Sequence, residues 1–231
     1  MKAFLLAAGL GTRLKPITDN IPKCLVKIHN QPLLYYWLKL CEKYGIDEVI
    51  INLHYLPDKV KEFLKGNQTA VRVKTVFEKK LLGSGGTILN NKDFVKGEES
   101  FFIFYADNLT NANLEKMKSF HKTHNEFLTM GLFITNSPES CGIAELDRSE
   151  KIINFVEKPK KPKSNLANAG IYLARQEIFS LFPDNKELID FGFDILPKLV
   201  NKMYGFVISD YLIDIGTIEN YRRAQIEWKG L

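Results

Sequence analysis

Unbroken apolar runs and alternating runs along the chain predict its strands. Residues 3–8 are apolar without alternation, which predicts a strand buried on both faces. Residues 48–53 (EVIINL) and 101–105 (FFIFY) show the same pattern. Residues 71–77 instead alternate between apolar and polar positions, as expected of a half-exposed strand.

Helical periodicity separates these predicted strands. Apolar residues at three- and four-residue spacing indicate a helix over residues 33–44, which Gly45 would end. Pro57 would open a second helix, and Gly66 would end it. This alternation predicts an α/β fold with a mostly parallel, twisted sheet flanked by helices and right-handed crossovers.

The second half of the chain predicts shorter elements. A helix is expected over residues 114–120 and a strand over 127–135. Residues 141–156 have the pattern of a β-hairpin around the polar turn DRSEK. Further predictions are a short apolar helix within 190–199, a strand at 204–208, and a last helix that Thr217 caps and that buries Ile218, Tyr221, Ala224 and Trp228.

Composition narrows the class of protein. The chain has 231 residues and is 45% hydrophobic, enough for a sizeable core. A net charge of +5 without an aromatic-basic repeat suits small anionic ligands rather than nucleic acid. Three cysteines without metal-like spacing argue against a disulfide scaffold or a zinc site and favour a cytoplasmic location. The apolar N-terminal run is too short for a membrane span and lacks a cleavage site, so neither membrane nor export is expected.

A loop of small residues and cations follows the first predicted strand. Such a loop is where an open α/β sheet holds a phosphorylated ligand. Gly9 and Gly11 would let backbone N–H groups approach phosphate oxygens, while Arg13 can grip phosphate as a fork and Lys23 acts as a point charge. A dinucleotide fingerprint is excluded because Leu14 stands where its third glycine belongs, and no P-loop sequence occurs.

Residues 6–14 (LAAGLGTRL), followed by Pro16, Thr18, Pro22, Lys23 and Leu25, resemble the signature of the sugar-1-phosphate nucleotidyltransferases. The resemblance implies a Rossmann-like core in one domain over residues 1–231. Its nucleotide-binding half would cover about residues 1–110 and its sugar-phosphate-binding half about 111–231, with the hairpin as a small sugar-binding lobe. The implied nucleotide-binding residues in this stretch are Leu6, Ala7, Ala8, Gly9, Gly11, Thr12 and Arg13.

A second glycine-rich stretch, residues 78–87 (EKKLLGSGGT), resembles the base-reading segment of the same family. Gly85 and Gly86 would lie against the nucleobase, and a helix would begin near Thr87. Gly85 stands where the family usually has alanine. By itself this stretch also has the composition of a flexible loop.

Two aspartates are the implied magnesium ligands. Asp107 follows the apolar strand at 101–105, and a carboxylate there suits Mg²⁺, which takes one or two protein carboxylates and fills its shell with water and phosphate. The alternative for Asp107 is a turn cap shared with Asn108 and Thr110. Asp214 lies in an Asp-Ile-Gly-Thr segment that resembles the family's second metal-binding segment.

The implied sugar-phosphate site follows the hairpin. Glu157 can accept hydrogen bonds from two sugar hydroxyls, and Lys158 can contact the sugar's phosphate. Asn168 opens an Asn-Ala-Gly-Ile-Tyr segment like that of the family and offers both a donor and an acceptor. Cys141 stands where family members often have an aromatic residue. The full set implied by the resemblance is Asn108, Gly142, Glu157, Lys158 and Asn168.

These residues imply in-line, magnesium-assisted attack of a sugar 1-phosphate on the α-phosphorus of a nucleoside triphosphate, with pyrophosphate released. Arg13, Lys23 and Asp107 would be catalytic, and Asp107 and Asp214 would hold Mg²⁺. The glycine loop and the Asn168 segment favour GTP and a mannose- or heptose-type sugar. A uridylyl- or thymidylyltransferase acting on another sugar 1-phosphate is the alternative.

Two other classes and three local assignments stay open. A non-catalytic sugar-nucleotide-binding subunit should have lost the cations or carboxylates, and a nicotinamide-dependent oxidoreductase should have the third glycine. His121 and His124 could ligate a metal, but with no third ligand nearby a surface helix is the expectation. Asp190 and Asp194 fit caps as well as ligands, and the sequence leaves open whether the chain forms a homo-oligomer.

Overall fold

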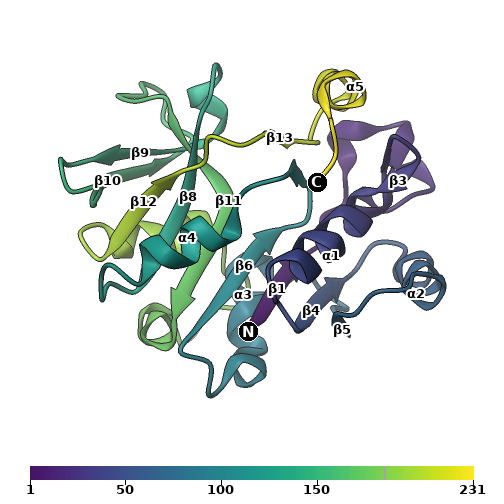
Figure 1. Ribbon diagram of the computed structural model, residues 1–231, viewed down its shortest axis with the longest axis horizontal. Helices are drawn as coiled ribbons and strands as arrows, with labels where there is room; N and C mark the ends of the chain where they lie inside the picture. The colour runs from purple at the N-terminus through teal and green to yellow at the C-terminus, as the bar shows by residue number, and fades with distance from the viewer. Residues whose placement is uncertain (185) are drawn as a thin grey trace. The chain divides into compact units, whose positions relative to one another are not determined.

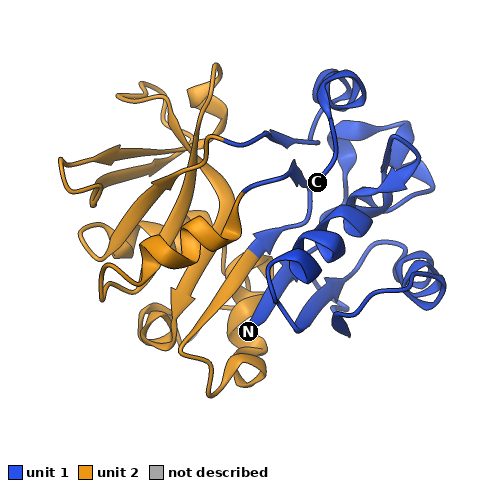
Figure 2. Cartoon of the chain, viewed as in Figure 1, with its two compact units in different colours: residues 1–81, 104–112, 210–231 blue, residues 82–103, 113–209 orange. Residues whose placement is uncertain are grey.

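The chain folds into two compact units, each assembled from separated stretches of sequence. The structure is a computed structural model that describes residues 1–184 and 186–231. Figure 2 shows unit 1 in blue and unit 2 in orange. Unit 1 consists of residues 1–81, 104–112 and 210–231, and unit 2 consists of residues 82–103 and 113–209.

Unit 1 is built on parallel strands, which Figure 1 shows side by side. β1 (Lys2–Leu6) pairs in parallel with β4 (Glu48–Leu53), and β4 pairs in parallel with β5 (Arg72–Phe77). The end of β6 (Ser100–Tyr105) lies on the other side of β1, where the Ala106 amide donates to the Leu6 carbonyl at 3.0 Å. The buried interiors of β1, β4 and β6 confirm the prediction from their apolar runs.

The first strand ends earlier than its apolar run predicts. Residues 3–8 were expected as strand, but β1 stops at Leu6. At that point the Ala7 amide donates to the side chain of Asn52 at 2.7 Å. Ala7 and Ala8 therefore belong to the loop that follows.

The helices of unit 1 follow the predicted periodicity. α1 (Leu33–Lys43) packs Trp37 on the ring of Phe104, with ring centroids 4.7 Å apart. α2 (Pro57–Gly66) begins and ends where proline and glycine predict. α5 (Ile218–Glu227) begins after Thr217, whose side chain accepts a hydrogen bond from the Asn220 amide.

An apolar cluster in unit 1 supports the loop after β1. Burying each large apolar side chain contributes about 1.5–3 kcal/mol relative to leaving it exposed. Leu14 brings the loop into this cluster, and Trp228 brings in the end of the chain. The members are Leu14, Val26, Ile28, Leu33, Leu109, Ile213, Ile215, Ala224 and Trp228.

Two short ladders complete unit 1. β2 (Lys27–Ile28) pairs with β3 (Gln31–Pro32), and β7 (Asn108–Thr110) pairs with β13 (Leu212–Asp214), both antiparallel. The second ladder joins the stretch after β6 to the last fifth of the chain.

Unit 2 is a mixed sheet with helices. β11 (Leu166–Arg175) pairs antiparallel with β8 (Leu128–Ile134) and with β9 (Gly142–Leu146). In the strand order β11 lies between β9 and β6. β9 and β10 (Ile152–Glu157) form the predicted hairpin, and β9 joins it to β11. β12 (Met203–Val207) pairs in parallel with β8.

The helices of unit 2 are α3 (Gly83–Asn90) and α4 (Leu114–His121). The predicted start of α3 near Thr87 is wrong, because its glycine-rich first turn is already helical. Glycine lowers helix propensity, so the local pattern hides this turn, which packing against Ile189 stabilises. Short 3₁₀-helices follow at Gln176–Leu181 and Leu196–Leu199, and a short π-helix at Phe191–Ile195.

The predicted α/β class, with a mostly parallel central sheet flanked by helices, is confirmed. In unit 1, β1, β4 and β5 pair in parallel. In unit 2, the pairings described are antiparallel except for that of β8 with β12. Among the described residues, no helix is long and apolar enough to cross a membrane.

Candidate active site

The loop after β1 is a series of tight turns. Gly11 has a φ of +66°, and a Cβ there would lie 3.0 Å from Cγ2 of Thr18, so the turn requires glycine. The Thr18 hydroxyl donates to the Gly11 carbonyl at 2.7 Å and holds the turn closed. A Cβ at Gly9 would meet no described atom within 4 Å, which leaves its backbone open to a ligand.

Lys23 contacts two carboxylates of unit 1. Its Nζ is 2.6 Å from Oδ2 of Asp107 and 3.2 Å from Oδ1 of Asp214, and its side chain is only 9% exposed. One ammonium reaches both carboxylates, so the two aspartates are close enough to share a small cation. No group of three or more His, Cys, Asp or Glu side chains suited to a metal occurs among the described residues, but Mg²⁺ needs only one or two carboxylates. This donor pair therefore fits a magnesium ion.

Backbone pairing brings the two aspartates together. In the β7–β13 ladder Asp214 lies opposite Asn108, and the Ile215 amide donates to the Asp107 carbonyl at 2.9 Å. The side-chain amide of Asn220 donates to the Asp214 carbonyl at 2.9 Å. The backbone on both sides of the pair is thus held independently of the carboxylates themselves.

Burial and neighbouring charges shift the pKa values of Asp214 and Lys23. Burial raises the pKa of Asp214, and the negative charge of Asp107 adds to the rise, while Lys23 opposes it. For Lys23, burial disfavours the charged form, but the two carboxylates outweigh burial and raise its pKa. Arg13 is exposed, with Nη2 3.9 Å from Oδ2 of Asp214. A Cβ on Gly216 would collide with the Asp214 carboxylate and lie 3.0 Å from Arg13 Nη2.

The sequence interpretation missed a buried polar pair beneath the loop. Asn52 accepts the Ala7 amide through Oδ1, and its Nδ2 donates to Oε1 of Glu78 at 3.0 Å. Both side chains are buried. The available signal was the amide of Asn52 inside an otherwise apolar strand, because a buried amide requires partners.

In unit 2, Glu157 lies between two glycines. A Cβ on Gly142 would collide with the Glu157 carboxylate, and a Cβ on Gly192 would lie 3.0 Å from Oε2 of the same group. Burial raises the pKa of Glu157; the charge of Lys158 opposes this rise, and the charge of Asp190 adds to it. The Glu157 carboxylate therefore occupies a space that exists because Gly142 and Gly192 have no side chains.

The other predicted sugar residues of unit 2 are ordered by local contacts. Asn168 donates through Nδ2 to the Tyr172 hydroxyl at 2.6 Å and accepts the Gly170 amide at 3.0 Å. The register of β11 against β8 shifts between Asn168 and Tyr172, where Gly170 has a φ of +64°. The ammonium of Lys158 lies 5.9 Å from the centre of the Phe193 ring.

The second glycine stretch packs inside unit 2. The Gly86 amide donates to the Ile189 carbonyl at 3.0 Å, and a Cβ on Gly85 would lie 2.7 Å from Cγ2 of Ile189. Both glycines are buried in α3. This packing by itself requires glycine at these positions, and contact with a nucleobase stays a prediction.

The structure thus brings together four predicted residues within unit 1: Arg13, Lys23, Asp107 and Asp214. Gly142 and Glu157 come together within unit 2. Asn108, predicted for the sugar phosphate, belongs to unit 1, where its carbonyl accepts the Trp37 indole N–H at 2.9 Å. Asp190 and Asp194 act as caps: Asp190 accepts the Phe193 amide, and Asp194 accepts the Asp190 amide.

The expectation that His121 and His124 lie on a surface helix is wrong. Both side chains are buried, and both contact the hydroxyl of Thr129, at 2.7 and 2.8 Å. Burial lowers the pKa of His121 to about 3 and that of His124 to about 4, and the charge of Arg175 adds to each shift. The pair is part of the core of unit 2.

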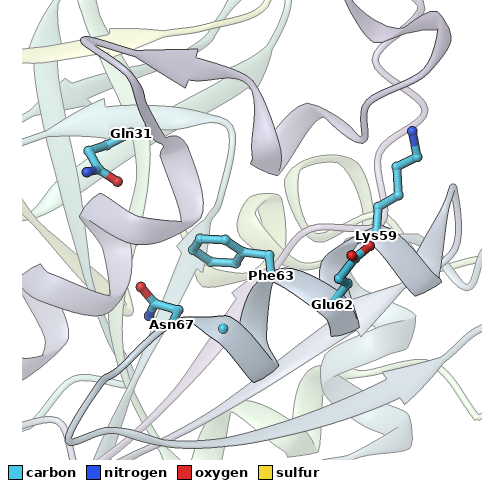
Figure 3. A pocket seen from close by; sticks show the side chains of 6 residues that line it. Gln31, Lys59, Glu62, Phe63 and Asn67 are labelled. Atoms are coloured by element: carbon cyan, nitrogen blue, oxygen red, sulfur yellow. The ribbon is translucent and has the colours of Figure 1, made fainter.

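A pocket of about 500 Å³ in unit 1 lies apart from these residues (Figure 3). The ring of Phe63 points to the side on which Gln31 and Asn67 lie. None of the residues that line this pocket is one of the predicted site residues. The lining residues are Gln31, Lys59, Glu62, Phe63, Gly66 and Asn67.

Comparisons with known proteins show the family of the chain. The family model for nucleotidyl transferases matches residues 2–229. A D-glycero-alpha-D-manno-heptose 1-phosphate guanylyltransferase of Aneurinibacillus thermoaerophilus is 34% identical, over 98% of each chain. One of Campylobacter jejuni is 33% identical, over 96% of this chain and 97% of its own.

A solved structure shows the same fold. The crystal structure of HddC from Yersinia pseudotuberculosis complexed with GMP-PN superposes with a TM-score of 0.83 at 28% identity, covering 99% of both chains. The chain belongs to the nucleotidyl transferase family and is an enzyme of the sugar-1-phosphate nucleotidyltransferase type, as its motifs predict.

Proposed function

We propose that this enzyme transfers GMP from GTP to a mannose- or heptose-type sugar 1-phosphate and releases pyrophosphate. The observation that carries the chemistry is the group formed by Lys23, Asp107 and Asp214, with Arg13 beside it. The base and the sugar rest on similarity, because the two relatives described above are heptose 1-phosphate guanylyltransferases and the similar crystal structure contains GMP-PN. The three free cysteines suit the reducing cytoplasm, where we place the reaction.

The residues of unit 1 would handle the phosphates. Both substrates are anions that repel each other, so positioning and positive charge can supply most of the catalysis. Arg13 would hold the β- and γ-phosphates and the departing pyrophosphate, and Lys23 would contact the α-phosphate. Asp107 and Asp214 would hold Mg²⁺, and the ion would supply positive charge for the phosphoryl transfer. Gly9, Gly11 and Thr12 would present backbone N–H groups to the triphosphate.

The residues of unit 2 would hold the sugar. Glu157, fixed between Gly142 and Gly192, would accept hydrogen bonds from two sugar hydroxyls. Asn168 has its amide oriented by Tyr172 and Gly170 and would bind a further hydroxyl. Lys158 would pair with the phosphate of the sugar. Together these groups would orient the attacking phosphate oxygen.

A substrate panel tests this function. The purified chain is incubated with Mg²⁺, each of GTP, ATP, CTP, UTP and dTTP, and each of mannose, heptose, glucose and N-acetylglucosamine 1-phosphate, with pyrophosphate release as the readout. We expect turnover with GTP and with mannose or heptose 1-phosphate. Preference for UTP or dTTP would overturn the base assignment. Tight sugar-nucleotide binding without pyrophosphate release from any pair would indicate a non-catalytic subunit instead.

A further inference from the structure

Lys23 occupies the position between the two carboxylates that are proposed to hold the metal. Its ammonium donates to both Asp107 and Asp214, at 2.6 and 3.2 Å. The side chain is almost fully covered, so this contact is not a loose surface ion pair. A monovalent cation supplied by the chain itself thus offsets one of the two negative charges of the pair.

A divalent ion and this ammonium compete for the same oxygens. Two cations a few ångströms apart repel strongly in a partly buried site. A magnesium ion also needs direct contact with carboxylate oxygens, to which Lys23 now donates. Binding of the metal therefore requires the ammonium to leave at least part of its present position.

The backbone of Lys23 is held separately from its ammonium. Its backbone is held in the turn Lys23–Leu25, where the Val26 amide donates to the Lys23 carbonyl at 3.1 Å. The ammonium is at the end of a flexible four-carbon chain, so it can reach another acceptor by rotation of the side chain alone. A nucleotide phosphate would be such an acceptor.

We propose that Lys23 blocks the metal site until a nucleotide phosphate draws its ammonium away, so that the nucleotide and the divalent ion bind cooperatively. This inference rests on the proposed function, because it takes the α-phosphate as the new partner of Lys23. By linkage, the factor by which nucleotide strengthens metal binding equals the factor by which the metal strengthens nucleotide binding.

The test measures binding of Mn²⁺ alone, without nucleotide, by calorimetry and by the electron paramagnetic resonance signal of free Mn²⁺. Lys23→Met removes the competing ammonium, and Lys15→Met is the matched control, since it removes an equal charge from an exposed loop position. We expect Lys23→Met to bind Mn²⁺ roughly tenfold or more tightly than the wild type, within the usual range for coupled sites. Lys15→Met should bind like the wild type, and adding Asp107→Asn to Lys23→Met should abolish the gain.

Equal Mn²⁺ affinity of the wild type and Lys23→Met would overturn the inference, and so would weaker binding by the variant. Tight Mn²⁺ binding by the wild type without nucleotide would overturn it too, even if Lys23→Met failed to fold. Either result leaves the proposed function standing if the wild type still releases pyrophosphate from GTP. Failure of the function itself is detected separately, in the substrate panel.

Discussion

The amide of Ile215 donates to the backbone carbonyl of Asp107 at 2.9 Å. This hydrogen bond continues the short β7–β13 ladder and places the stretch around Asp214 beside the end of β6. The carboxylates meet because the backbone pairs, and their side chains are not needed for that pairing. Substitutions at these aspartates therefore test chemistry with little disturbance of the fold.

Asp107→Asn should lower the rate of pyrophosphate release by ~10²–10³, the usual loss when one well-placed charged group is removed from such a site. Asp214→Asn should have an effect of similar size, because both carboxylates face the same cation. Asp58→Asn, at a side chain that is 93% exposed on α2, is the control and should keep wild-type turnover. Near-normal turnover of Asp107→Asn with Mg²⁺ would contradict the metal assignment.

Gly142→Ala should weaken binding of the sugar 1-phosphate. The new methyl group would collide with the Glu157 carboxylate and displace it from its slot. We expect a higher KM for the sugar 1-phosphate with little change in the KM for GTP, measured by steady-state kinetics. Gly66→Ala is the control, because a Cβ there meets no described atom within 4 Å. If Gly142→Ala has the same KM as the wild type for the sugar 1-phosphate and also for GTP, Glu157 does not bind the sugar.

The stability of the fold should fall as the pH is lowered from about 6.5 toward 4. The pKa values of His121 and His124 are lowered to about 3 and about 4, so the unfolded chain, with a histidine pKa near 6.5, takes up protons that the native state does not. At pH 5 His121 is still neutral in the native state but protonated in the unfolded chain. This difference should lower the free energy of unfolding by about 2 kcal/mol relative to its value at neutral pH. Urea denaturation at pH 7.5, 6 and 5 measures this loss.

Two variants check that assignment. His121→Gln should flatten the dependence of the urea midpoint on pH. His29→Gln, at an exposed histidine that contacts Gln225, should keep the dependence of the wild type. A midpoint that stays constant from pH 7.5 to pH 5 would show that the buried pair does not control acid stability.

Thr129→Val should destabilise unit 2. The Glu126 amide donates to Nδ1 of His124, so Nε2 of His124 carries the proton and donates to the Thr129 hydroxyl. Nδ1 of His121 lies 2.7 Å from the same hydroxyl. Valine leaves both buried ring nitrogens without this partner, at about 1–3 kcal/mol for each. Thr123→Val, at an exposed site, should change the urea midpoint much less. If both variants unfold at the same urea concentration, the shared hydroxyl contributes nothing.

The sequence predicted regular elements well and their exceptions poorly. The periodicity of residues 33–44 and the proline and glycine at positions 57 and 66 gave α1 and α2 correctly. The first turn of α3 was missed because its glycines disfavour helix locally, and packing on Ile189 outweighs that preference. His121 and His124 were predicted on the surface because the sequence of their own segment does not show that Thr129 will contact both of them in the core.

The chain itself encodes its family, its buried strands and the charged groups available for phosphate chemistry, because apolar spacing and contiguous motifs are properties of neighbouring residues. Tertiary structure alone decided that one lysine would bridge two aspartates from distant segments, and that Glu157 would lie between two glycines. Those contacts depend on which strands pair and in what register, and backbone hydrogen bonds between remote segments set that register. No spacing along the sequence records them.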